Sequence, residues 1–260
     1  MIVDNVITIS KYFPEFNASI AAGIAVFSRM LGFIYIAPIV SRKEIPAIVK
    51  LPFCFLMTIM IVSSLHPGAM PADTSLILVC ILNMVAGFII GYAAIAIFSA
   101  IASGGDMINM QMGLSSAVMF DQSTKSQSSI LGTFFGLFGL VIFINIGGFY
   151  WLFDAMLRSF DIFPLYGSSI PLSELVNMEY LISITSGVLF FGLQIAAPVL
   201  LATLGQDIIL GIISKTAPQV NVFSLSFLFK PVLGVAVLIV VLPALVNVIT
   251  DYFTSFSQIY

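Results

Sequence analysis

Six long apolar runs constrain the fold of this chain more than any other feature of its sequence. They extend over Asn17–Val40, Ala47–Leu65, Ser75–Ser103, Ile130–Phe153, Tyr180–Ser214 and Val220–Ile249. A helix needs about 20 mostly apolar residues to cross the hydrocarbon core of a bilayer, and these runs reach or approach that length. The sequence therefore predicts an all-α, membrane-associated fold of about six long, partly broken hydrophobic helices.

The composition excludes several classes of function. Of the 260 residues, 60% are hydrophobic and only 8% are charged, whereas soluble domains carry about 25% charged residues. The 9 Lys and Arg residues against 12 Asp and Glu residues leave no basic face for nucleic acid. A soluble enzyme and a nucleic-acid-binding protein are both excluded.

No motif for catalysis or metal binding stands out. Cys54 and Cys80 lie in separate apolar runs without a second ligand nearby, which predicts neither a disulfide nor a metal site. The sequence has no nucleotide-binding loop, HExxH motif, nucleophile elbow or paired catalytic carboxylates. We expect no catalytic residues, no metal and no cofactor.

The N-terminal segment has an apolar stripe of its own. The stripe recurs at steps of four and three and consists of Ile2, Val6, Ile9, Phe13, Phe16 and Ile20. This spacing is typical of one helix face, which Pro14 should kink or end. Two interpretations remain open, a helix lying on the bilayer surface and a contact face for a partner helix.

Small residues within the runs indicate close helix packing. Gly87 and Gly91 form one Gly-x-x-x-Gly pair, and Gly132 and Gly136 form another. Such pairs let helix backbones approach closely in lipid. Prolines in or at the ends of the runs should kink or break several helices. These prolines are Pro38, Pro198, Pro231 and Pro243.

Three charged residues lie deep inside apolar runs: Arg29, Asp207 and Lys230. A charge at the bilayer centre costs about 2.5–3.5 kcal/mol, so a lone side chain facing lipid is unfavourable. The residues could belong to an ion pathway, form a buried ion pair, or lie outside lipid altogether. Asp207 and Lys230 could pair across the last hairpin, and burial against other subunits is the alternative.

The stretch from Gly104 to Ser129 is the least apolar part of the interior. It begins with Gly104-Gly105 and holds Met107, Met110 and Met112, interleaved with Asn109 and Gln111; Gly113, Met119 and Phe120 follow. Methionine side chains adapt to differently shaped surfaces, so the cluster could close around a passing chain. A re-entrant or short amphipathic segment packed in the interior is the alternative.

An ordered set of motifs resembles the FliR family of flagellar export proteins and, more distantly, its counterparts in virulence-type type III secretion. The motifs are Arg29-x-x-Gly32, Ala37-Pro38, Ile45-Pro46, Gly104-Gly105, Gln111-Met112-Gly113-Leu114, Asp121, Gln127-Ser128, Leu131-Gly132, Asn145, Gly147-Gly148, Ala197-Pro198, Asp207, Leu210-Gly211 and Ala217-Pro218-Gln219-Val220-Asn221-Val222-Phe223. Phe229-Lys230-Pro231 departs from the small or apolar residues of many flagellar members, and lysine also occurs there in virulence-type relatives.

The resemblance implies a subunit of an export gate in the bacterial inner membrane, at the flagellar basal body. Such a subunit assembles with FliP-like and FliQ-like subunits, next to an FlhB-like subunit, into a closed channel for unfolded exported proteins. It further implies a FliP-like part in residues 1–175, a FliQ-like helical hairpin in 176–260, and a plug loop at about 104–122. In such a ring, much of the apolar surface contacts neighbouring subunits rather than lipid.

Two alternatives to a flagellar export gate stay open. The first is the equivalent subunit of a virulence-type secretion apparatus, or injectisome. The second is a secondary transporter, which needs a substrate or ion site at the membrane midplane and usually an internal inverted repeat; the sequence shows no convincing repeat.

Overall fold

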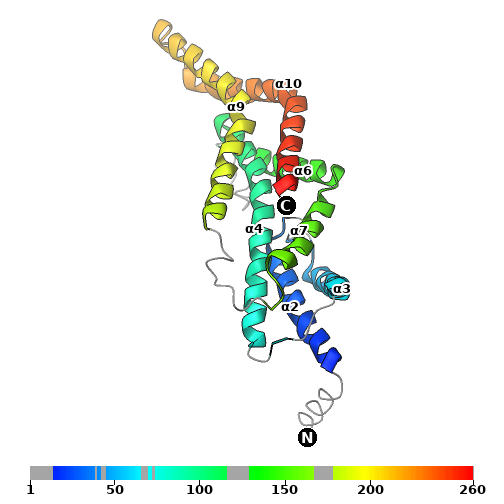
Figure 1. The fold of residues 1–260 in the computed structure, drawn as a ribbon. Coiled ribbons are helices and arrows are strands. Elements are labelled where there is room, and N and C mark those ends of the chain that lie inside the picture. Colours follow the sequence, from blue (N-terminus) through cyan, green and yellow to red (C-terminus); the bar gives the residue numbers. More distant parts are fainter. Residues whose placement is uncertain are drawn as a thin grey trace. The chain divides into compact units, whose positions relative to one another are not determined.

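Seven helices make up the parts of the chain that the computed structural model describes. These parts are residues 14–38, 40–41, 45–65, 70–71, 74–115, 129–166 and 178–259. Figure 1 shows the helices in chain order. They are α2 (Pro14–Ile36), α3 (Ala47–Leu65), α4 (Leu76–Gln111), α6 (Ile130–Asn145), α7 (Gly148–Ile162), α9 (Met178–Thr216) and α10 (Val222–Ile259). No strand occurs among these residues, and the predicted all-α fold is confirmed.

Most apolar runs became one helix each, with bounds close to those predicted. Helix α3 coincides with the predicted run Ala47–Leu65, and α9 extends two residues beyond its run at each end. Helix α10 starts at Val222, inside its run, and continues past the predicted end at Ile249 to Ile259. The fourth run is different, because its helix stops at Asn145 and a new one starts at Gly148. Gly147 lies in the break with φ of +75°, a conformation that glycine adopts without steric cost.

Prolines interrupt the helices less than the sequence suggested. Pro198 lies inside the uninterrupted helix α9, and Pro231 and Pro243 lie inside α10. Figure 1 shows that α10 changes direction along its length while remaining one helix. The expectation of kinks therefore holds for α10, and α2 ends at Ile36, shortly before Pro38. The break between α6 and α7 falls at a glycine instead.

Local hydrogen bonds define two of the helix starts. Ser129 precedes α6, and its side chain accepts a hydrogen bond of 2.9 Å from the backbone N–H of Gly132. Asn221 precedes α10 and accepts one of 3.2 Å from the N–H of Ser224. Such capping satisfies N–H groups that have no partner within the first helical turn.

The chain divides into two compact units. Unit 1 contains the residues up to Ile95 together with Tyr150–Leu181, and unit 2 contains Ala96–Phe149 and Ile182–Ile259. The two units are defined by their compactness, and each combines separate stretches of the sequence. The predicted boundary at residues 175 and 176 concerns resemblance to FliP-like and FliQ-like proteins, and it stays a prediction.

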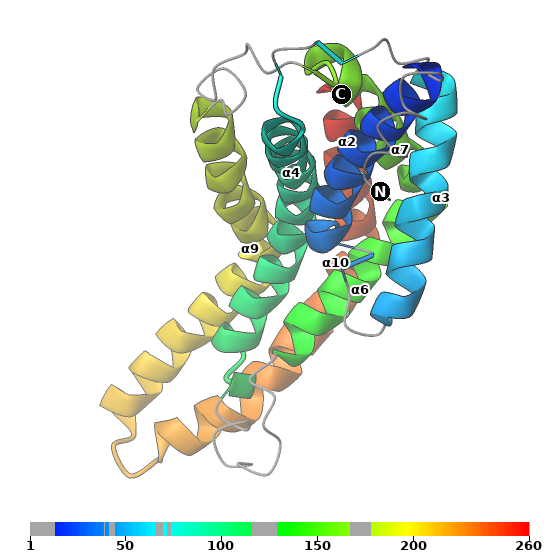
Figure 2. The same cartoon turned by 90° about the horizontal axis from the view of Figure 1, so that it is seen from below.

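Unit 1 has its core where α2, α3 and α7 meet. Figure 2 shows α2 and α3 side by side. The fully or almost fully buried members of the core include Val26, Met30 and Phe33 of α2, Cys54 of α3, and Met156 and Phe160 of α7. Cys54 thus serves as a small apolar core residue, in line with its position in the sequence.

Unit 2 has an aromatic core. The ring of Phe98 in α4 lies 5.1 Å from that of Phe143 in α6 and 5.4 Å from that of Phe253 in α10, measured between centroids. Phe191 of α9 stacks on Tyr252 of α10 with 3.6 Å between centroids. Aromatic pairs of this kind contribute about 0.5–1.5 kcal/mol beyond the burial of their area.

Glycines allow α2 and α4 to touch backbone to backbone. A methyl group at Gly87 would overlap the carbonyl oxygen of Arg29 and lie 2.9 Å from the backbone N of Phe33. One at Gly32 would overlap the carbonyl oxygen of Met84. Gly91 has a looser fit, since its methyl would lie 3.1 Å from the carbonyl oxygen of Phe33.

The two glycines of the second predicted pair differ in how closely another helix packs against them. A methyl group at Gly132 would overlap the carboxylate of Asp106, but one at Gly136 would lie 3.9 Å from Ala102 Cβ, an ordinary contact. Close packing therefore depends on Gly132 and not on Gly136.

We expect Gly87→Ala and Gly136→Ala to have different effects on stability. Gly87→Ala forces α2 away from α4 and should lower the free energy of unfolding by about 1–3 kcal/mol. Gly136→Ala, the matched control, should leave it unchanged or raise it, because alanine favours the helix. Thermal unfolding in mild detergent measures both, and equal midpoints for the two variants would contradict the close α2–α4 contact.

Candidate functional site

Arg29 forms a buried polar cluster in unit 1. Its side chain has no solvent exposure. The guanidinium donates to Asn83 Oδ1 of α4 from Nε at 3.0 Å and from Nη2 at 2.7 Å. It also donates to Ser159 Oγ of α7 at 3.0 Å and to the carbonyl oxygen of Phe163 at 2.8 Å. One side chain of α2 is thereby tied to α4 and to the end of α7.

Aromatic rings and a second amide complete this cluster. The guanidinium carbon lies 3.9 Å from the ring centroid of Phe160 and 5.5 Å from that of Phe163. The amide of Asn83 donates in turn to the carbonyl oxygens of Val79 at 2.8 Å and Leu165 at 3.0 Å. The hydrogen-bond acceptors of Arg29 in the described structure are all neutral, so cation–π contact and polar acceptors, not a carboxylate, stabilise its charge.

This arrangement distinguishes between the interpretations that the sequence left open for the buried charge of Arg29. The side chain is buried in protein, forms no ion pair within the described residues, and connects three helices. Its two side-chain partners, Asn83 and Ser159, are not among the residues predicted from the sequence. Asn83 is a lone amide inside an apolar run, and that signal could have indicated it.

The first part of the proposed plug segment is helical. Residues Gly104 to Gln111 form the last turns of α4, so the segment does not begin as a loop at Gly104. The chain leaves the helix at Gly113, whose φ of +75° requires a residue that tolerates left-handed backbone. The last part of the segment, residues 116–122 with Met119 and Phe120, lies outside the described residues.

Gly104 and Gly105 have a packing role in unit 2. A methyl group at Gly104 would lie 3.0 Å from the carbonyl oxygen of Gly192 in α9. One at Gly105 would lie 2.9 Å from the Cα of Gly132 in α6. Adjacent glycines on α4 therefore let two different helices approach it closely.

The methionines of the segment have different environments. Met112 is 1% exposed, and it lies so close to Gly234 of α10 that a methyl group there would be 2.8 Å from its Sδ atom. Met110 is 72% exposed, and Met107 is half-buried. Gln111 is also half-buried. The segment thus has an anchored methionine at Met112 and an outward-facing one at Met110.

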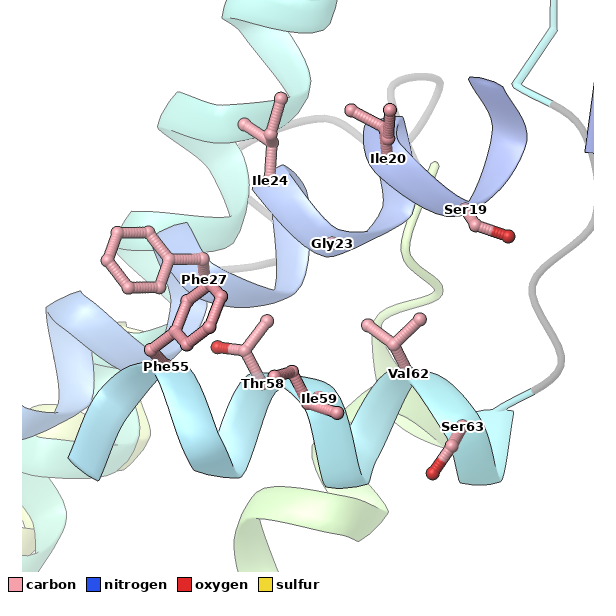
Figure 3. Close-up of a pocket in the computed structure, with 10 residues that line it drawn as sticks. All are labelled: Ser19, Ile20, Gly23, Ile24, Phe27, Phe55, Thr58, Ile59, Val62 and Ser63. Atoms are coloured by element: carbon pink, nitrogen blue, oxygen red, sulfur yellow. The ribbon is translucent and has the colours of Figure 1, made fainter. Parts of the chain in front are cut away.

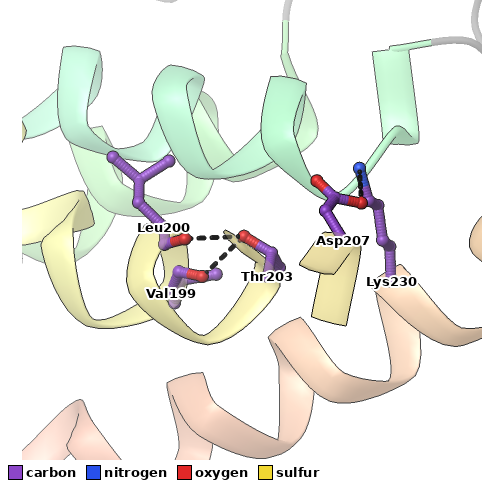
Figure 4. A network of polar contacts seen from close by, with 5 residues as sticks. All are labelled: Val199, Leu200, Thr203, Asp207 and Lys230. Carbon is purple, nitrogen blue, oxygen red and sulfur yellow. Dashed lines mark hydrogen bonds and ion pairs between the residues drawn. The ribbon is translucent and has the colours of Figure 1, made fainter. Parts of the chain in front are cut away.

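Asp207 and Lys230 form an ion pair in unit 2. Lys230 Nζ of α10 lies 2.9 Å from Asp207 Oδ1 of α9, and the side chains are 21% and 39% exposed, respectively. Figure 4 shows this pair next to Thr203, whose hydroxyl donates to the carbonyl oxygens of Val199 and Leu200. The pairing left open by the sequence is formed.

Two amide side chains of unit 2, those of Asn109 and Gln206, lack complete hydrogen bonding within the described residues. Asn109 donates from Nδ2 to Ser115 Oγ at 3.0 Å, but its Oδ1 has no partner among the described residues. Neither amide atom of Gln206 has one there either. Unsatisfied buried amides cost free energy, so polar groups beyond the described residues would stabilise this part of unit 2.

No cluster of three or more potential metal ligands occurs in the described ranges.

Five helices are long and apolar enough to cross a membrane, namely α2, α3, α4, α9 and α10, and α6 with α7 makes a sixth candidate if counted as one span. The chain is thus a multi-pass helical membrane protein with buried polar connections between its helices.

The chain belongs to the family "Bacterial export proteins, family 1", whose pattern it matches over residues 20–256. It is 27% identical to flagellar biosynthetic protein FliR of Escherichia coli, with 83% of this chain and 82% of that protein covered. It is 26% identical to FliR of Bacillus subtilis over 95% and 93% of the two chains. Surface presentation of antigens protein SpaR of Shigella flexneri is 23% identical over 89% of each. Family and helices together make it an inner-membrane protein.

We expect Arg29→Met to destabilise unit 1 strongly. The change leaves Asn83, Ser159 and the carbonyl group of Phe163 buried without their donor, and it should cost about 3 kcal/mol or more. Thermal unfolding of the purified chain measures the loss.

The double variant Arg29→Met/Asn83→Leu provides the control. It removes the main acceptor together with the donor and should recover part of the loss, because an apolar pair leaves fewer orphaned groups. Full stability of Arg29→Met alone would contradict the role assigned to the guanidinium.

Proposed function

We propose that this chain is the FliR-type subunit of a flagellar type III protein export gate. With FliP-like and FliQ-like subunits, and next to an FlhB-like subunit, it forms the closed channel through which unfolded flagellar proteins leave the cell. The observation that carries this proposal is similarity to flagellar biosynthetic proteins over more than four-fifths of the chain, at 26–29% identity.

The exposed apolar surface supports assembly with other subunits. Only 17% of the apolar part of α10 is buried within the chain, and residues of α9 such as Leu201 and Ile208 are at least 60% exposed. In the proposed complex, neighbouring subunits and lipid share this surface. The proposed role is passive and non-enzymatic: the chain supplies a wall and a closure for the channel, and partners deliver the substrate.

The equivalent subunit of an injectisome is the second candidate. Similarity to SpaR supports it, at the lower identity of 23%. Lys230 also departs from the usual flagellar pattern at its position, and here it pairs with Asp207. A secondary transporter is less favoured, and specific binding of a small solute by the isolated chain would support it.

Purification of a tagged full-length chain in mild detergent tests the proposal. We expect FliP-like and FliQ-like proteins to remain bound, because exposed helices such as α10 need apolar partners. Mass spectrometry identifies the bound proteins, and sequence comparison assigns them to flagellar or injectisome sets. A well-behaved monomer with no bound subunit would contradict the export-gate proposal.

Within the gate, we propose that residues 104–122 close the channel. The contacts of Gly104, Gly105 and Met112 support a fixed base for this segment in unit 2. Met110 supplies an adaptable side chain that is 72% exposed. Met107, Gln111, Met119 and Phe120 belong to the same proposed segment.

We expect Met110→Ala and Met112→Ala to separate closure from stability. Met110→Ala removes an exposed side chain and should raise ion leakage through the assembled gate without lowering its thermal stability. Met112→Ala leaves a cavity beside Gly234 and should cost about 2–4 kcal/mol. Conductance of membranes that contain the assembled gate measures the leak.

Met60→Ala is the matched control for Met110→Ala, since Met60 of α3 is 63% exposed and lies in the other unit. It should leave the leak unchanged. Equal leakage of the Met110→Ala variant and wild type, with normal assembly, would count against closure by this segment.

A further inference from the structure

Two contacts of α10 lie about one helical turn apart in unit 2. Lys230 Nζ lies 2.9 Å from Asp207 Oδ1 of α9 (Figure 4). A methyl group at Gly234 would lie 2.8 Å from the Sδ atom of Met112, so the methionine packs directly against α10 at this glycine. Positions 230 and 234 are four residues apart, and such positions share one face of a helix. One face of α10 therefore contacts both α9 and the residue that follows α4.

Pro231 weakens α10 between these two contacts. Because proline has no backbone N–H, the helix lacks the hydrogen bond that residue 231 would otherwise donate to the carbonyl group of Phe227. The helix itself therefore fixes the direction of the next turn, which carries Gly234, less strictly. Contacts from other helices contribute more to the position of such a turn, and the ion pair of the neighbouring Lys230 supplies one of them.

Two backbone hydrogen bonds close the turn at the end of α4. The N–H of Met112 donates to the carbonyl oxygen of Ile108 at 2.9 Å, and the N–H of Gly113 donates to that of Met110 at 3.0 Å. Met112 is 1% exposed, so the burial of its side chain stabilises this turn. A shift of α10 at Gly234 would reduce that burial, and the two hydrogen bonds would open more often.

We infer that Asp207 and Lys230 are a positioning pair for the end of α4. Their attraction holds the turn of α10 that carries Gly234 in place, and this turn in its place keeps Met112 buried. The inference concerns contacts within unit 2 alone. Its consequence for the channel rests on the proposed function: if residues 104–122 close the channel, loss of the ion pair loosens the base of that segment and raises the leak.

Hydrogen–deuterium exchange of the purified full-length chain in mild detergent tests the positioning role. Lys230→Met and Asp207→Leu each leave one charge without its partner, and peptides covering residues 108–115 should then exchange several-fold faster than in wild type. Lys230→Arg keeps the charge and should exchange as wild type does. The reversed pair Asp207→Lys/Lys230→Asp restores an attraction and should recover most of the protection.

A reference peptide and a matched variant separate this local effect from general destabilisation. Residues 55–63 of α3, several of which line a groove in unit 1 (Figure 3), give the reference peptide, whose exchange should be the same in every variant. Arg158→Met is the matched control, because Arg158 Nε lies 2.8 Å from Asp154 Oδ2 in unit 1. This variant also removes one charge of an ion pair and should leave the exchange of residues 108–115 unchanged.

Two results would overturn the positioning role. The first is exchange of residues 108–115 at the wild-type rate in Lys230→Met. The second is a reversed pair that fails to slow the exchange, because the effect of the single variants would then come from side-chain shape and not from charge.

Ion leakage through the assembled gate distinguishes this inference from the proposed function. We expect Lys230→Met to raise the leak several-fold and the reversed pair to lower it again. Faster exchange of residues 108–115 in Lys230→Met without any change in the leak would support the positioning pair and contradict closure of the channel by residues 104–122.

Discussion

Close backbone contact along α4 is the constraint on which the rest of the structure depends. In lipid, helices gain little from the hydrophobic effect when they associate, so they need close packing and polar contacts. In unit 1, Gly87 meets the backbone of α2; in unit 2, Gly104 meets α9 and Gly105 meets α6. A side chain at any of these positions would separate the helices, and the polar contacts of each unit would lose their geometry.

The cluster around Arg29 shows how such packing makes a buried charge tolerable. The guanidinium donates four hydrogen bonds to three neutral groups, and a ring lies against its face. Because α2 and α4 approach so closely, Asn83 can contact the Nε and Nη2 atoms at once. Asp207 and Lys230 follow another principle: they neutralise each other across a hairpin and remain partly exposed. Charged residues in apolar runs are thus accommodated in two ways: Arg29 by neutral acceptors inside unit 1, and Asp207 and Lys230 by each other in unit 2.

Much of the fold was predictable from sequence because apolar length and helix bounds are local properties. Run Ala47–Leu65 is identical to α3, and the charges and glycines singled out do lie at helix contacts in most cases. The partners were not predictable. Nothing in the spacing of Gly132 and Gly136 distinguishes a tight contact from a loose one, since that difference arises from the path of α4. Similarly, Gly104-Gly105 reads as a loop signal, yet tertiary packing keeps both residues helical.

The contact between Met112 and Gly234 has a consequence for how this family can vary. At Gly87 the opposing atoms belong to the backbone of α2, so no exchange of side chains can make room for a larger residue. At Gly234 the opposing atoms all belong to the side chain of Met112. Those two positions can therefore change together through evolution, a larger residue on α10 accompanying a smaller one at the end of α4, whereas the α2–α4 crossing admits no such trade.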